Sequence, residues 1–503
     1  MLKALFGDLR AAPTHRPWPR FTADSQRWRG IGEALREGKL DLLGLWGDVD
    51  AVHCVLYEPA TRKVASASIE VSAGKAPSLA VFHAPASRLE RAAADLLGIE
   101  FVGLPDPRAW IDHGRWPIRT PLAQPQLPGA PVPPYRFLEA QGPSLHQIPV
   151  GPVHAGIIEP GHFRFTASGE TVVRLEERLG YTHKGIDKLL EGKSTEDAAR
   201  IAARVSGDST VAYSFSFARA VEAALAFEPP PRAVWLRAVM AELERIANHL
   251  GDVGAICNDA AFSMMHAECG ILRELVLRAC AVAFGHRLMM DCIVPGGVAA
   301  DLDAVGQEAI LRMTQRVQSQ FPELIELYDN TASLQDRTVG TGVVSAALAT
   351  QFAAPGVVGR ASGRSFDARL VLPYAPYDAV PIDVAMRAEG DVDARVWVRI
   401  QEILYSIAWL EAALGSLPRG PVHLPVNTTT PASVEGSALV EGFRGDILAS
   451  VRIGPAGRVE RCHLRDPSWF LWPLLEAAIE GNIVADFPLC NKSFNCSYSG
   501  HDL

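Results

Sequence analysis

The chain has 503 residues, 48% of them hydrophobic and 21% charged, and its formal net charge is −9. This length predicts two or three domains around a large core, and the acidic balance without a dense Lys/Arg run argues against a nucleic-acid-binding surface. The eight cysteines include no C-x-x-C pair, so they indicate neither a zinc ribbon nor a cysteine-held cluster, and they favour a cytoplasmic protein.

No membrane-spanning segment is expected. Met1-Leu-Lys-Ala-Leu-Phe6 begins like a signal peptide, but Asp8 and Arg10 shorten its apolar stretch. The longest stretch without charge, residues 338–359, contains several glycines and a proline, which predicts loops and short elements. We therefore expect any membrane contact to be made through partner subunits.

Residues 20–122 are predicted to form a small α/β domain. Alternating or β-branched residues favour strands at 52–57, 64–71 and 79–83, and residues 88–97 favour a helix. Residues 123–150 follow as a stiff linker, because prolines recur through them at positions such as Pro125, Pro128 and Pro131.

Residues 151–503 are predicted to be mainly helical with peripheral hairpins, so the fold class is α+β. A hairpin is expected at 161–175, with Ser168-Gly169 as its turn. Long apolar-periodic segments predict helices at 232–250, 396–414 and 468–480.

The helix at 232–250 carries a polar stripe beside its apolar one. Glu242, Arg245 and His249 recur at helical spacing along this second stripe. One interpretation is a helix edge with an ordinary i,i+3 ion pair, which periodicity alone favours. The other is a polar set that faces an internal channel.

A family resemblance rests on motifs that occur in one order along residues 151–503. They are Gly151-Pro-Val-His154, Glu159-Pro-Gly-His162-Phe-Arg-Phe165, Leu179-Gly-Tyr-Thr-His183-Lys-Gly-Ile-Asp-Lys188, Ala241-Glu-Leu-Glu-Arg-Ile-Ala-Asn-His-Leu250, Pro295-Gly-Gly-Val298, Gly359-Arg-Ala-Ser-Gly363 and Pro373-Tyr-Ala-Pro-Tyr377-Asp378. This part resembles the large subunit of formate-hydrogenlyase-type (group 4) nickel–iron hydrogenases and, equally, the related 49-kDa subunit of complex I. A collinear match over about 350 residues is more specific than any single short motif.

The N-terminal domain carries a second resemblance. Leu89-Glu-Arg-Ala-Ala-Ala-Asp-Leu-Leu-Gly-Ile-Glu-Phe101, Pro105-Asp-Pro-Arg108 and Arg119-Thr-Pro-Leu122 are similar to the 30-kDa subunit of complex I. Fusion of the two modules is the arrangement seen in formate-hydrogenlyase-type large subunits. Residues 1–20 are not covered by the resemblance.

The hydrogenase resemblance implies a nickel–iron site, but the four cysteines that would hold it are absent. In the family's R-x-C-G-x-C-x-x-x-H motif, Arg204 is kept, Ser206 and Ser209 replace the cysteines, and Tyr213 replaces the histidine. In the C-terminal D-P-C-x-x-C motif the cysteines become Ser497 and Gly500. Because hydroxyl groups are poor ligands for soft metals, we expect no nickel–iron centre and no cofactor held by this chain.

Two neighbouring observations concern the tail. Cys496 falls one position away from a ligand position. Hydrogenases of this type are matured by clipping a C-terminal extension, and the sequence stops at Leu503, shortly after the altered motif. This ending agrees with the expected loss of the metal.

The complex I resemblance implies a quinone in the same cavity. His154 keeps the first histidine of the family's G-P-x-H-P-x-x-H-G motif, but the second falls on Ile158 and the quinone-binding tyrosine falls on Gly207. Asp259 aligns with the acidic residue that partners the missing histidine. A quinone is therefore a candidate ligand, but this chain lacks the two hydrogen-bond donors that the family resemblance implies for it.

His154, Glu159, Asp259 and Tyr213 are the candidate residues of a proton or quinone cavity, in which burial would shift their pKa values. The alternative is a hydrogen-bonded network without function. His183 and His249 are expected to be structural. Arg204 is expected to pair with either Asp208 or Asp259; the sequence does not choose between them.

Three functions follow from the resemblance. The first is a subunit of a membrane-associated energy-converting oxidoreductase complex without a nickel–iron site, which docks an iron–sulfur small subunit and membrane ion-translocating subunits and passes electrons to a quinone or couples to ion translocation. The second is a catalytically silent subunit that transmits conformational change. The third, an active hydrogenase, would require Cys257, Cys490 and Cys496 to converge.

The resemblance also sets further expectations. Membership of this family implies NAD binding in such a complex, and any iron–sulfur cluster is expected in the partner subunit. The expected location is the cytoplasmic face of the plasma membrane, reached through the partner subunits.

Overall fold

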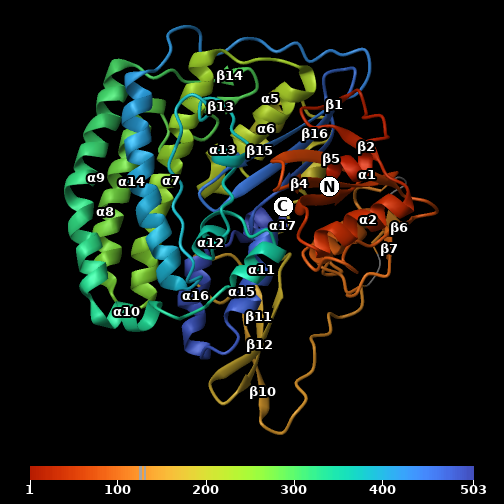
Figure 1. The fold of residues 1–503 in the computed structure, drawn as a ribbon, viewed down its shortest axis with the longest axis horizontal. Coiled ribbons are helices and arrows are strands. Elements are labelled where there is room, and N and C mark those ends of the chain that lie inside the picture. The colour runs from red at the N-terminus through yellow and green to blue at the C-terminus, as the bar shows by residue number, and fades with distance from the viewer. Residues whose placement is uncertain (124–126, 130–131) are drawn as a thin grey trace.

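In a computed structural model the protein is described at residues 1–123, 127–129 and 132–503. Part of the predicted linker, residues 124–126 and 130–131 with Pro125 and Pro131, lies outside the described residues. The α+β fold class is confirmed: a small N-terminal domain of sheet and helices packs beside a larger, mainly helical part (Figure 1).

The N-terminal domain is built on a four-stranded sheet of order β2-β5-β4-β3, covered by α2 and α3. Asp24 caps α2 by accepting a hydrogen bond from the backbone N–H of Arg27, and Gly98 ends α3 in the left-handed conformation. The elements of this part are α1 (Leu2–Phe6), β2 (Arg20–Thr22), α2 (Ser25–Arg36), β3 (Asp41–Gly47), β4 (Ala51–Glu58), β5 (Lys63–Glu70), β6 (Lys75–Pro77), α3 (Ala86–Leu97), β7 (Glu100–Val102), β8 (Ile118–Arg119) and β9 (Leu127–Pro128).

Four long helices, α7, α8, α9 and α14, stand side by side and form the main bundle (Figure 1). Pro231 occupies the first turn of α7, where no backbone donor is needed, and Asp303 and Asp391 cap α9 and α14. The helices are α4 (Ile186–Leu190), α5 (Thr195–Ala202), α6 (Thr210–Leu225), α7 (Pro231–Asp259), α8 (Ser263–Phe284), α9 (Ala304–Asn330), α10 (Ala332–Thr338), α11 (Ala346–Gln351), α12 (Gly356–Ala361), α13 (Ala368–Val371), α14 (Val392–Gly415), α15 (Ser468–Ala478), α16 (Phe487–Phe494) and α17 (Tyr498–Asp502).

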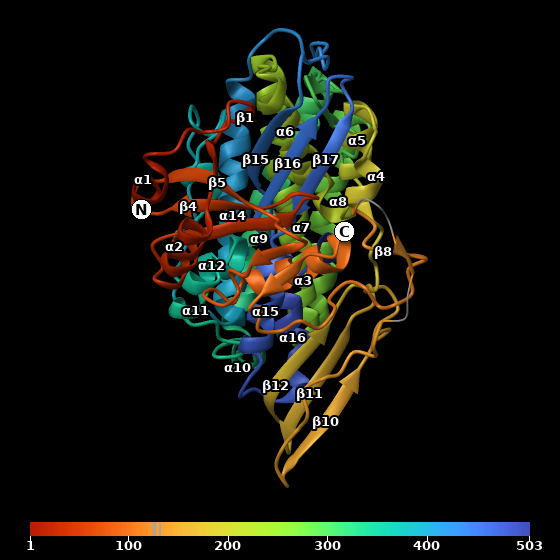
Figure 2. The same cartoon turned by 90° about the vertical axis from the view of Figure 1, so that its right-hand side faces the viewer.

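Two sheets flank the bundle. One has the order β1-β15-β16-β17 and lies between α6 and the N-terminal domain, and the other, β10-β11-β12, projects away from the body (Figure 2). The strands are β1 (His15–Arg16), β10 (Leu145–Val150), β11 (His162–Ser168), β12 (Thr171–Arg178), β13 (Ile293–Val294), β14 (Gly297–Val298), β15 (Val434–Glu441), β16 (Asp446–Ile453) and β17 (Val459–Arg465).

A pair of strands and a hydrophobic cluster join the N-terminal domain to the larger part. β1, from the N-terminal segment that the resemblance does not cover, pairs in parallel with β15 of the larger part. One continuous hydrophobic cluster joins N-terminal residues such as Trp28 and Leu89 to Phe163, Trp469 and Trp472. The N-terminal domain is therefore packed against β11, α15 and the C-terminal segment through apolar side chains.

Apart from helix and strand ends, such as the end of α7 at Asp259 instead of Leu250, the expected elements differ from the structure at three places. Residues 79–83 form turns, and the hairpin turn is Gly169-Glu170, one residue later than expected. The last six residues of the predicted linker are β10, which pairs with β11 in full antiparallel register. Short segments paired by distant partners have no strong periodicity of their own, which explains these errors.

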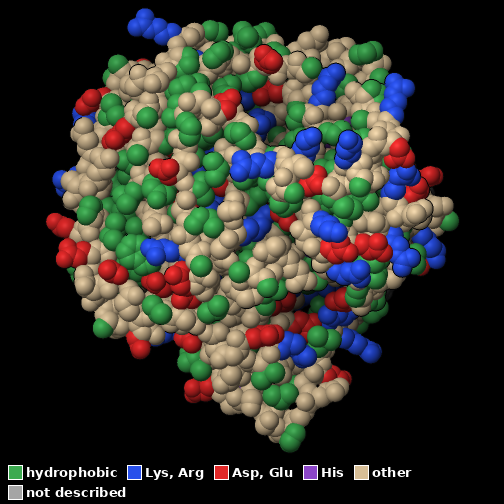
Figure 3. All heavy atoms as spheres, in the orientation of Figure 1, with side chains coloured by type: hydrophobic (Ala, Val, Ile, Leu, Met, Phe, Trp, Pro, Cys, Tyr) green, Lys and Arg blue, Asp and Glu red, His purple; other side chains and the backbone are tan. Residues whose placement is uncertain are grey.

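None of the helices in the described parts combines the length and apolar character that crossing a bilayer would take. On the face seen in Figure 3, Lys/Arg and Asp/Glu side chains are interspersed, and apolar side chains lie among them.

Candidate functional site

The two altered motifs meet at one cavity. A cavity of about 600 Å³ is bounded by residues 150–159, by Ser206–Asp208 and by the C-terminal segment 487–499, with Asp259 and Arg444 completing its wall. Ser206 and Ser497, which are 291 positions apart in the chain, lie within hydrogen-bond distance, with 3.0 Å between their Oγ atoms. Ser206–Asp208 and the tail therefore lie side by side, whereas Arg204 and Tyr213 do not line the cavity.

The floor of the cavity is a polar cluster centred on Asp208. Its carboxylate accepts hydrogen bonds from Ser206 Oγ at 2.7 Å and from Arg444 Nη1 at 3.1 Å, and Arg444 Nη2 forms an ion pair with it. Ser209 Oγ accepts from Arg444 Nη1 at 2.9 Å. Burial would raise the pKa of Asp208, but the adjacent Arg444 guanidinium lowers it to about 2, so the pair is charged.

At position 500, where the resemblance implies the fourth cysteine, the space for a side chain is occupied by Asp466. Gly500 lies against Asp466, and a Cβ atom there would be 2.6 Å from Asp466 Cγ. Asp466 accepts a hydrogen bond from the Tyr213 hydroxyl at 2.7 Å and from the Ser468 N–H at 2.8 Å. A larger side chain at position 500 would have to displace this carboxylate.

The residues at these positions do not fit a nickel–iron centre. The hydroxyl of Ser497 is already used as the N-cap of α17, where it accepts from the Gly500 N–H at 2.9 Å, and Ser206 is bound to Asp208. The described residues also bring no set of three His, Cys, Asp or Glu side chains into an arrangement for a metal ion. The donor set is hard oxygen engaged in internal hydrogen bonds, whereas such a centre takes soft thiolates.

The candidate residues divide between the wall and the interior. His154, Glu159 and Asp259 line the cavity, but Tyr213 is fully buried outside the wall, bonded to Asp466. Glu159 accepts hydrogen bonds from the N–H and the hydroxyl of Ser499, and His154 Nε2 lies 3.4 Å from the Tyr498 hydroxyl. Partial burial raises the pKa of Asp259.

The outer rim of the cavity is apolar. Ile157 is 99% exposed and Ile158 is 50% exposed, and both line the cavity, while Val153 nearby is 80% exposed. Exposed branched residues gathered in one loop at a cavity mouth are unusual on an isolated surface and mark a contact site.

A second charged group lies beside the floor. Asp252 on α7 accepts from Asn495 Nδ2 at 2.8 Å and from Arg399 Nε at 3.1 Å, and Lys492 Nζ lies 3.5 Å away. Because Asn495 also accepts a hydrogen bond from Arg444 through its carbonyl oxygen, the cavity floor connects to α7 and α14.

The polar stripe of α7 faces the interior. Glu242 accepts from Arg369, Tyr377 and Ser406, and His249 Nε2 lies 2.8 Å from Glu402 Oε2. The structure thus corrects the interpretation as a helix edge, because tertiary contacts supply buried partners that periodicity cannot show. Glu242, Arg245 and His249 are each at most 1% exposed and surrounded by these partners, so the set is a packed ion network and not an open channel.

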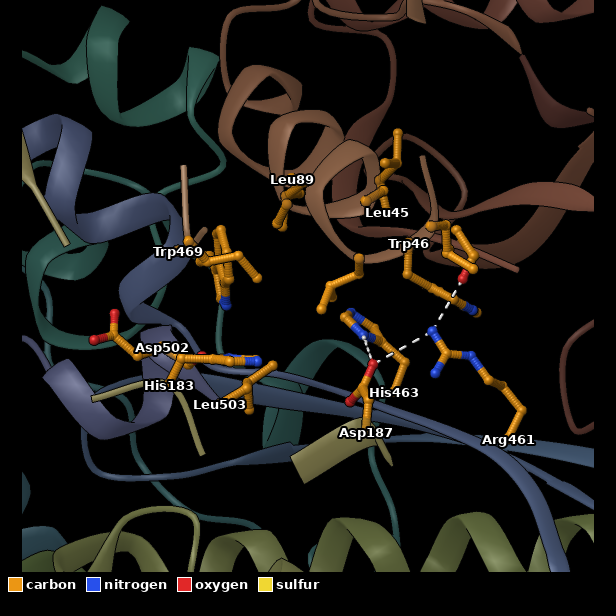
Figure 4. A pocket seen from close by; sticks show the side chains of 16 residues that line it. Leu45, Trp46, Leu89, His183, Asp187, Arg461, His463, Trp469, Asp502 and Leu503 are labelled. Atoms are coloured by element: carbon orange, nitrogen blue, oxygen red, sulfur yellow. Dashed lines mark hydrogen bonds and ion pairs between the residues drawn. The ribbon is translucent and has the colours of Figure 1, made fainter. Parts of the chain in front are cut away.

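His183 lies away from the large cavity, at the interface with the N-terminal domain (Figure 4). Its Nδ1 atom is 2.7 Å from the Asp502 carbonyl oxygen, and its ring packs on Trp116. It lines a small cavity of about 40 Å³ that also contacts Asp187, Arg461 and His463. These contacts are consistent with the structural role expected for His183.

Arg204 pairs with neither of its two expected partners. It forms a bidentate, exposed ion pair with Asp291, at 2.6 and 2.7 Å. The true partner of Asp208 is Arg444, in the β15–β16 turn Gly442-Phe-Arg-Gly445, which sequence reasoning missed. An arginine flanked by Gly442 and Gly445 is a weak sequence signal for a projecting side chain in a turn, and it does not identify the partner.

Both parts of the chain match models of known protein families. The sequence model "Respiratory-chain NADH dehydrogenase, 49 Kd subunit" matches residues 259–502, and "Respiratory-chain NADH dehydrogenase, 30 Kd subunit" matches residues 21–126. The chain is 29% identical to formate hydrogenlyase subunit 5 of Escherichia coli K12, over 90% of this chain and 82% of that protein. It is 31% identical to the carbon monoxide-induced hydrogenase of Rhodospirillum rubrum, over 70% of this chain and 98% of that protein.

A third relative comes from the respiratory branch. It is a subunit of the NADH-quinone oxidoreductase of Acidiphilium cryptum and is 32% identical, over 57% of this chain and 70% of that protein. The predicted resemblance is confirmed for both halves. The chain belongs to the family of complex I 49-kDa subunits and related membrane-bound hydrogenase subunits, with a 30-kDa-subunit-like domain at its N-terminal side.

Proposed function

We propose that this chain is a subunit of a membrane-associated, energy-converting oxidoreductase complex that works without a nickel–iron centre and receives a quinone headgroup in the cavity of about 600 Å³. The observation that supports the proposal is that the cavity is open beside Ser206 and Ser497, where the resemblance implies metal-ligand positions. Tyr213 and Phe494, whose side chains would fill the cavity in a silent subunit, are both buried outside its wall.

The size and lining of the cavity support a ligand with a polar head and an apolar tail. Cavities of about 300–1,000 Å³ with mostly apolar walls and a few placed polar groups are typical small-molecule sites. At the floor, Arg444 and the Tyr498 hydroxyl are donors suited to carbonyl oxygens, whereas the Ser206 hydroxyl donates to Asp208. At the mouth, Ile157 and Ile158 provide an apolar rim for the tail.

Quinone reduction consumes two electrons and two protons and yields the quinol. In this proposal an iron–sulfur cluster of a docked small subunit supplies the electrons, and the protons come from the water-accessible carboxyl groups Glu159 and Asp259. Arg444 orients the headgroup, and the Asp208 carboxylate keeps that arginine in place. Transfer to another acceptor, and coupling to ion translocation by membrane subunits, belong to the same proposal.

The names of the relatives support assembly with partners. Formate hydrogenlyase subunit 5 and membrane-bound hydrogenase subunit alpha are named as subunits, and so is the relative from the NADH-quinone oxidoreductase. We infer that this chain likewise binds an iron–sulfur small subunit and membrane subunits on the cytoplasmic face. NADH, bound elsewhere in the complex and oxidised there to NAD, is the source of reducing equivalents in this proposal.

Gly207 allows a direct test. A Cβ atom added at Gly207 meets no other atom within 4 Å, and the residue lines the cavity, so Gly207→Trp places an indole in the open space. In the purified intact complex, we expect Gly207→Trp to lower quinone reductase activity at least about tenfold, because the headgroup loses its space. Activity is followed by the absorbance of a short-chain quinone.

The matched control is Gly270→Trp on the exposed face of α8, where an added Cβ also meets nothing within 4 Å. Quinone reduction unchanged by Gly207→Trp, with normal assembly, would contradict the proposal. A complex that reduces no quinone in either form would instead indicate the silent, conformational role, and stoichiometric nickel would indicate a hydrogenase.

A further inference from the structure

A second large cavity lies between the N-terminal domain and β12, away from the site described above. Its volume is about 670 Å³. Its wall includes Asp95 on α3, residues 107–109, 112, 113 and 119, residues 132–137, and Arg178 and Tyr181 at and just beyond the end of β12. It shares no lining residue with the proposed quinone cavity. Nothing in the proposed electron transfer uses it.

Arg178 is the unusual residue of this wall. Only 3% of the residue is exposed, and its Nε and Nη1 atoms have no hydrogen-bond partner among the described residues. Its Nη2 atom donates to the Asp112 carbonyl oxygen at 3.1 Å, and no carboxylate of the described residues forms an ion pair with it. The charge of Asp95 acts on Arg178 from beyond ion-pair distance. A buried guanidinium with two unpartnered nitrogen atoms and no direct ion pair is costly, and such a group calls for a partner.

Three arginines surround Tyr135 in the same wall. The guanidinium carbons of Arg178, Arg108 and Arg91 lie 4.5, 4.7 and 6.0 Å from the Tyr135 ring centre. Tyr135 thus covers the face of Arg178 from the side of residues 132–137. Arg119 and Arg136 are exposed at the rim, without a carboxylate partner among the described residues.

The acidic groups nearby are occupied. Asp95 Oδ2 accepts three backbone hydrogen bonds, from Trp110, Ile111 and Asp112, at 2.7 to 3.1 Å. Asp112 Oδ1 accepts from the Gly114 N–H at 2.7 Å. Arg108 is satisfied by Asp106 and Glu176, which leaves Arg178, Arg119 and Arg136 as guanidinium groups of this wall without a carboxylate among the described residues.

We propose that this interdomain cavity binds a small molecule bearing an oxyanion, a carboxylate or a phosphate, which serves as the counter-ion of Arg178. Guanidinium groups bind both oxyanions through paired N–H donors, and the aromatic rings of Tyr135 and Tyr181 can hold an organic body beside them. Because β12 and residues 107–113 come from different domains, the ligand would bridge the N-terminal domain and the larger part.

Calorimetric titration of the purified full-length chain at low ionic strength tests this, with inorganic phosphate and malonate as separate probes. We expect saturable binding of one equivalent of at least one probe, with a dissociation constant near or below about 1 mM. Stronger binding of phosphate assigns a phosphorylated ligand, and stronger binding of malonate assigns a carboxylate.

Variants at the cavity decide whether Arg178 is responsible. Arg178→Gln should weaken binding at least about tenfold, because a charge-assisted pair is lost, and Arg178→Lys should weaken it less. If Arg178→Gln fails to fold, the exposed double change Arg119→Gln and Arg136→Gln is expected to weaken binding severalfold. Arg419→Gln, an exposed and remote arginine, is the control.

Two results would overturn the proposal. One is the absence of saturable binding of both probes to the wild-type chain. The other is binding that Arg419→Gln weakens as much as the cavity variants do, because this would reflect only the general charge of the surface.

Discussion

Two glycines of the candidate site illustrate how much a single position depends on its surroundings. Gly207 borders open space, whereas Gly500 is pressed against the Asp466 carboxylate that Tyr213 holds by a hydrogen bond. Both stand at positions that the family motifs give to functional side chains. The space beside Gly207 is open, whereas the space beside Gly500 is filled by Asp466.

A pair of alanine substitutions tests this difference. Gly500→Ala is expected to lower the free energy of unfolding by about 1–3 kcal/mol, because its Cβ overlaps a fixed carboxylate. Gly207→Ala should change it by less than about 0.5 kcal/mol, because nothing lies within 4 Å. Urea denaturation of both variants measures the two values. Equal effects would show that Asp466 moves freely.

At the scale of elements, α7 and α14 are held together by a buried network of alternating charge. Glu402 of α14 pairs with Arg360 at 2.6 Å and accepts from His249 of α7, and all three residues are buried. Burial would raise the pKa of Glu402, but Arg360 and His249 lower it well below its ordinary value, so the carboxylate is charged. The network positions the helix that carries Asp252 to the cavity floor.

Removing the Glu402 carboxylate should therefore lower the free energy of unfolding strongly. Glu402→Gln is expected to cost about 3–5 kcal/mol of unfolding free energy, because Arg360 keeps its charge in the interior with fewer partners. Glu308→Gln on α9 breaks an exposed i,i+4 pair with Arg312 and should cost less than about 0.5 kcal/mol. Thermal and urea denaturation compare the two variants. Similar losses of unfolding free energy would show that the buried network contributes no more to stability than the exposed ion pair.

For the whole molecule, an ion cluster joins the N-terminal domain to the larger part. Arg88 of α3 lies 3.2 Å from Glu177 of β12 and 2.7 Å from Glu476 of α15. Burial raises the pKa of both carboxyl groups, and Arg88 opposes that rise. Because the folded-state pKa values exceed the ordinary value, the folded protein binds more protons, and these groups lose stabilising effect as the pH rises above about 4.5.

Arg88→Met should make this dependence steeper. The variant is expected to lose about 3–5 kcal/mol of unfolding free energy at pH 8. At that pH each buried carboxyl group is either charged without its partner or stays protonated although the unfolded chain would release the proton. The loss should be smaller at pH 5. Urea denaturation at the two pH values measures it, with the exposed Arg29→Met as control. A loss independent of pH would contradict the assignment.

Much of the fold was predictable from local signals. The long helices α14 and α15 have strong apolar periodicity, and β4 and β5 alternate or are β-branched, so their positions were expected within a few residues. The start of α7 was expected equally well, but the helix continues past the expected end at Leu250 to Asp259. The predictions of a strand at residues 79–83 and of a linker at β10 were wrong, because the conformation of these segments depends on distant partners. Of the candidate cavity, His154, Glu159 and Asp259 lie in the wall, whereas Tyr213 does not.

The sequence by itself determined the family frame and that Ser206, Ser209, Ser497 and Gly500 are not cysteines, because residue identity and order need no coordinates. Only the tertiary structure decided that Arg444 neutralises Asp208, that Asp466 closes the space at Gly500, and that the cavity beyond them stays open. The Asp208–Arg444 and Tyr213–Asp466 contacts join residues more than 200 positions apart in the chain. Such contacts arise from packing of the whole chain and leave no local pattern to read.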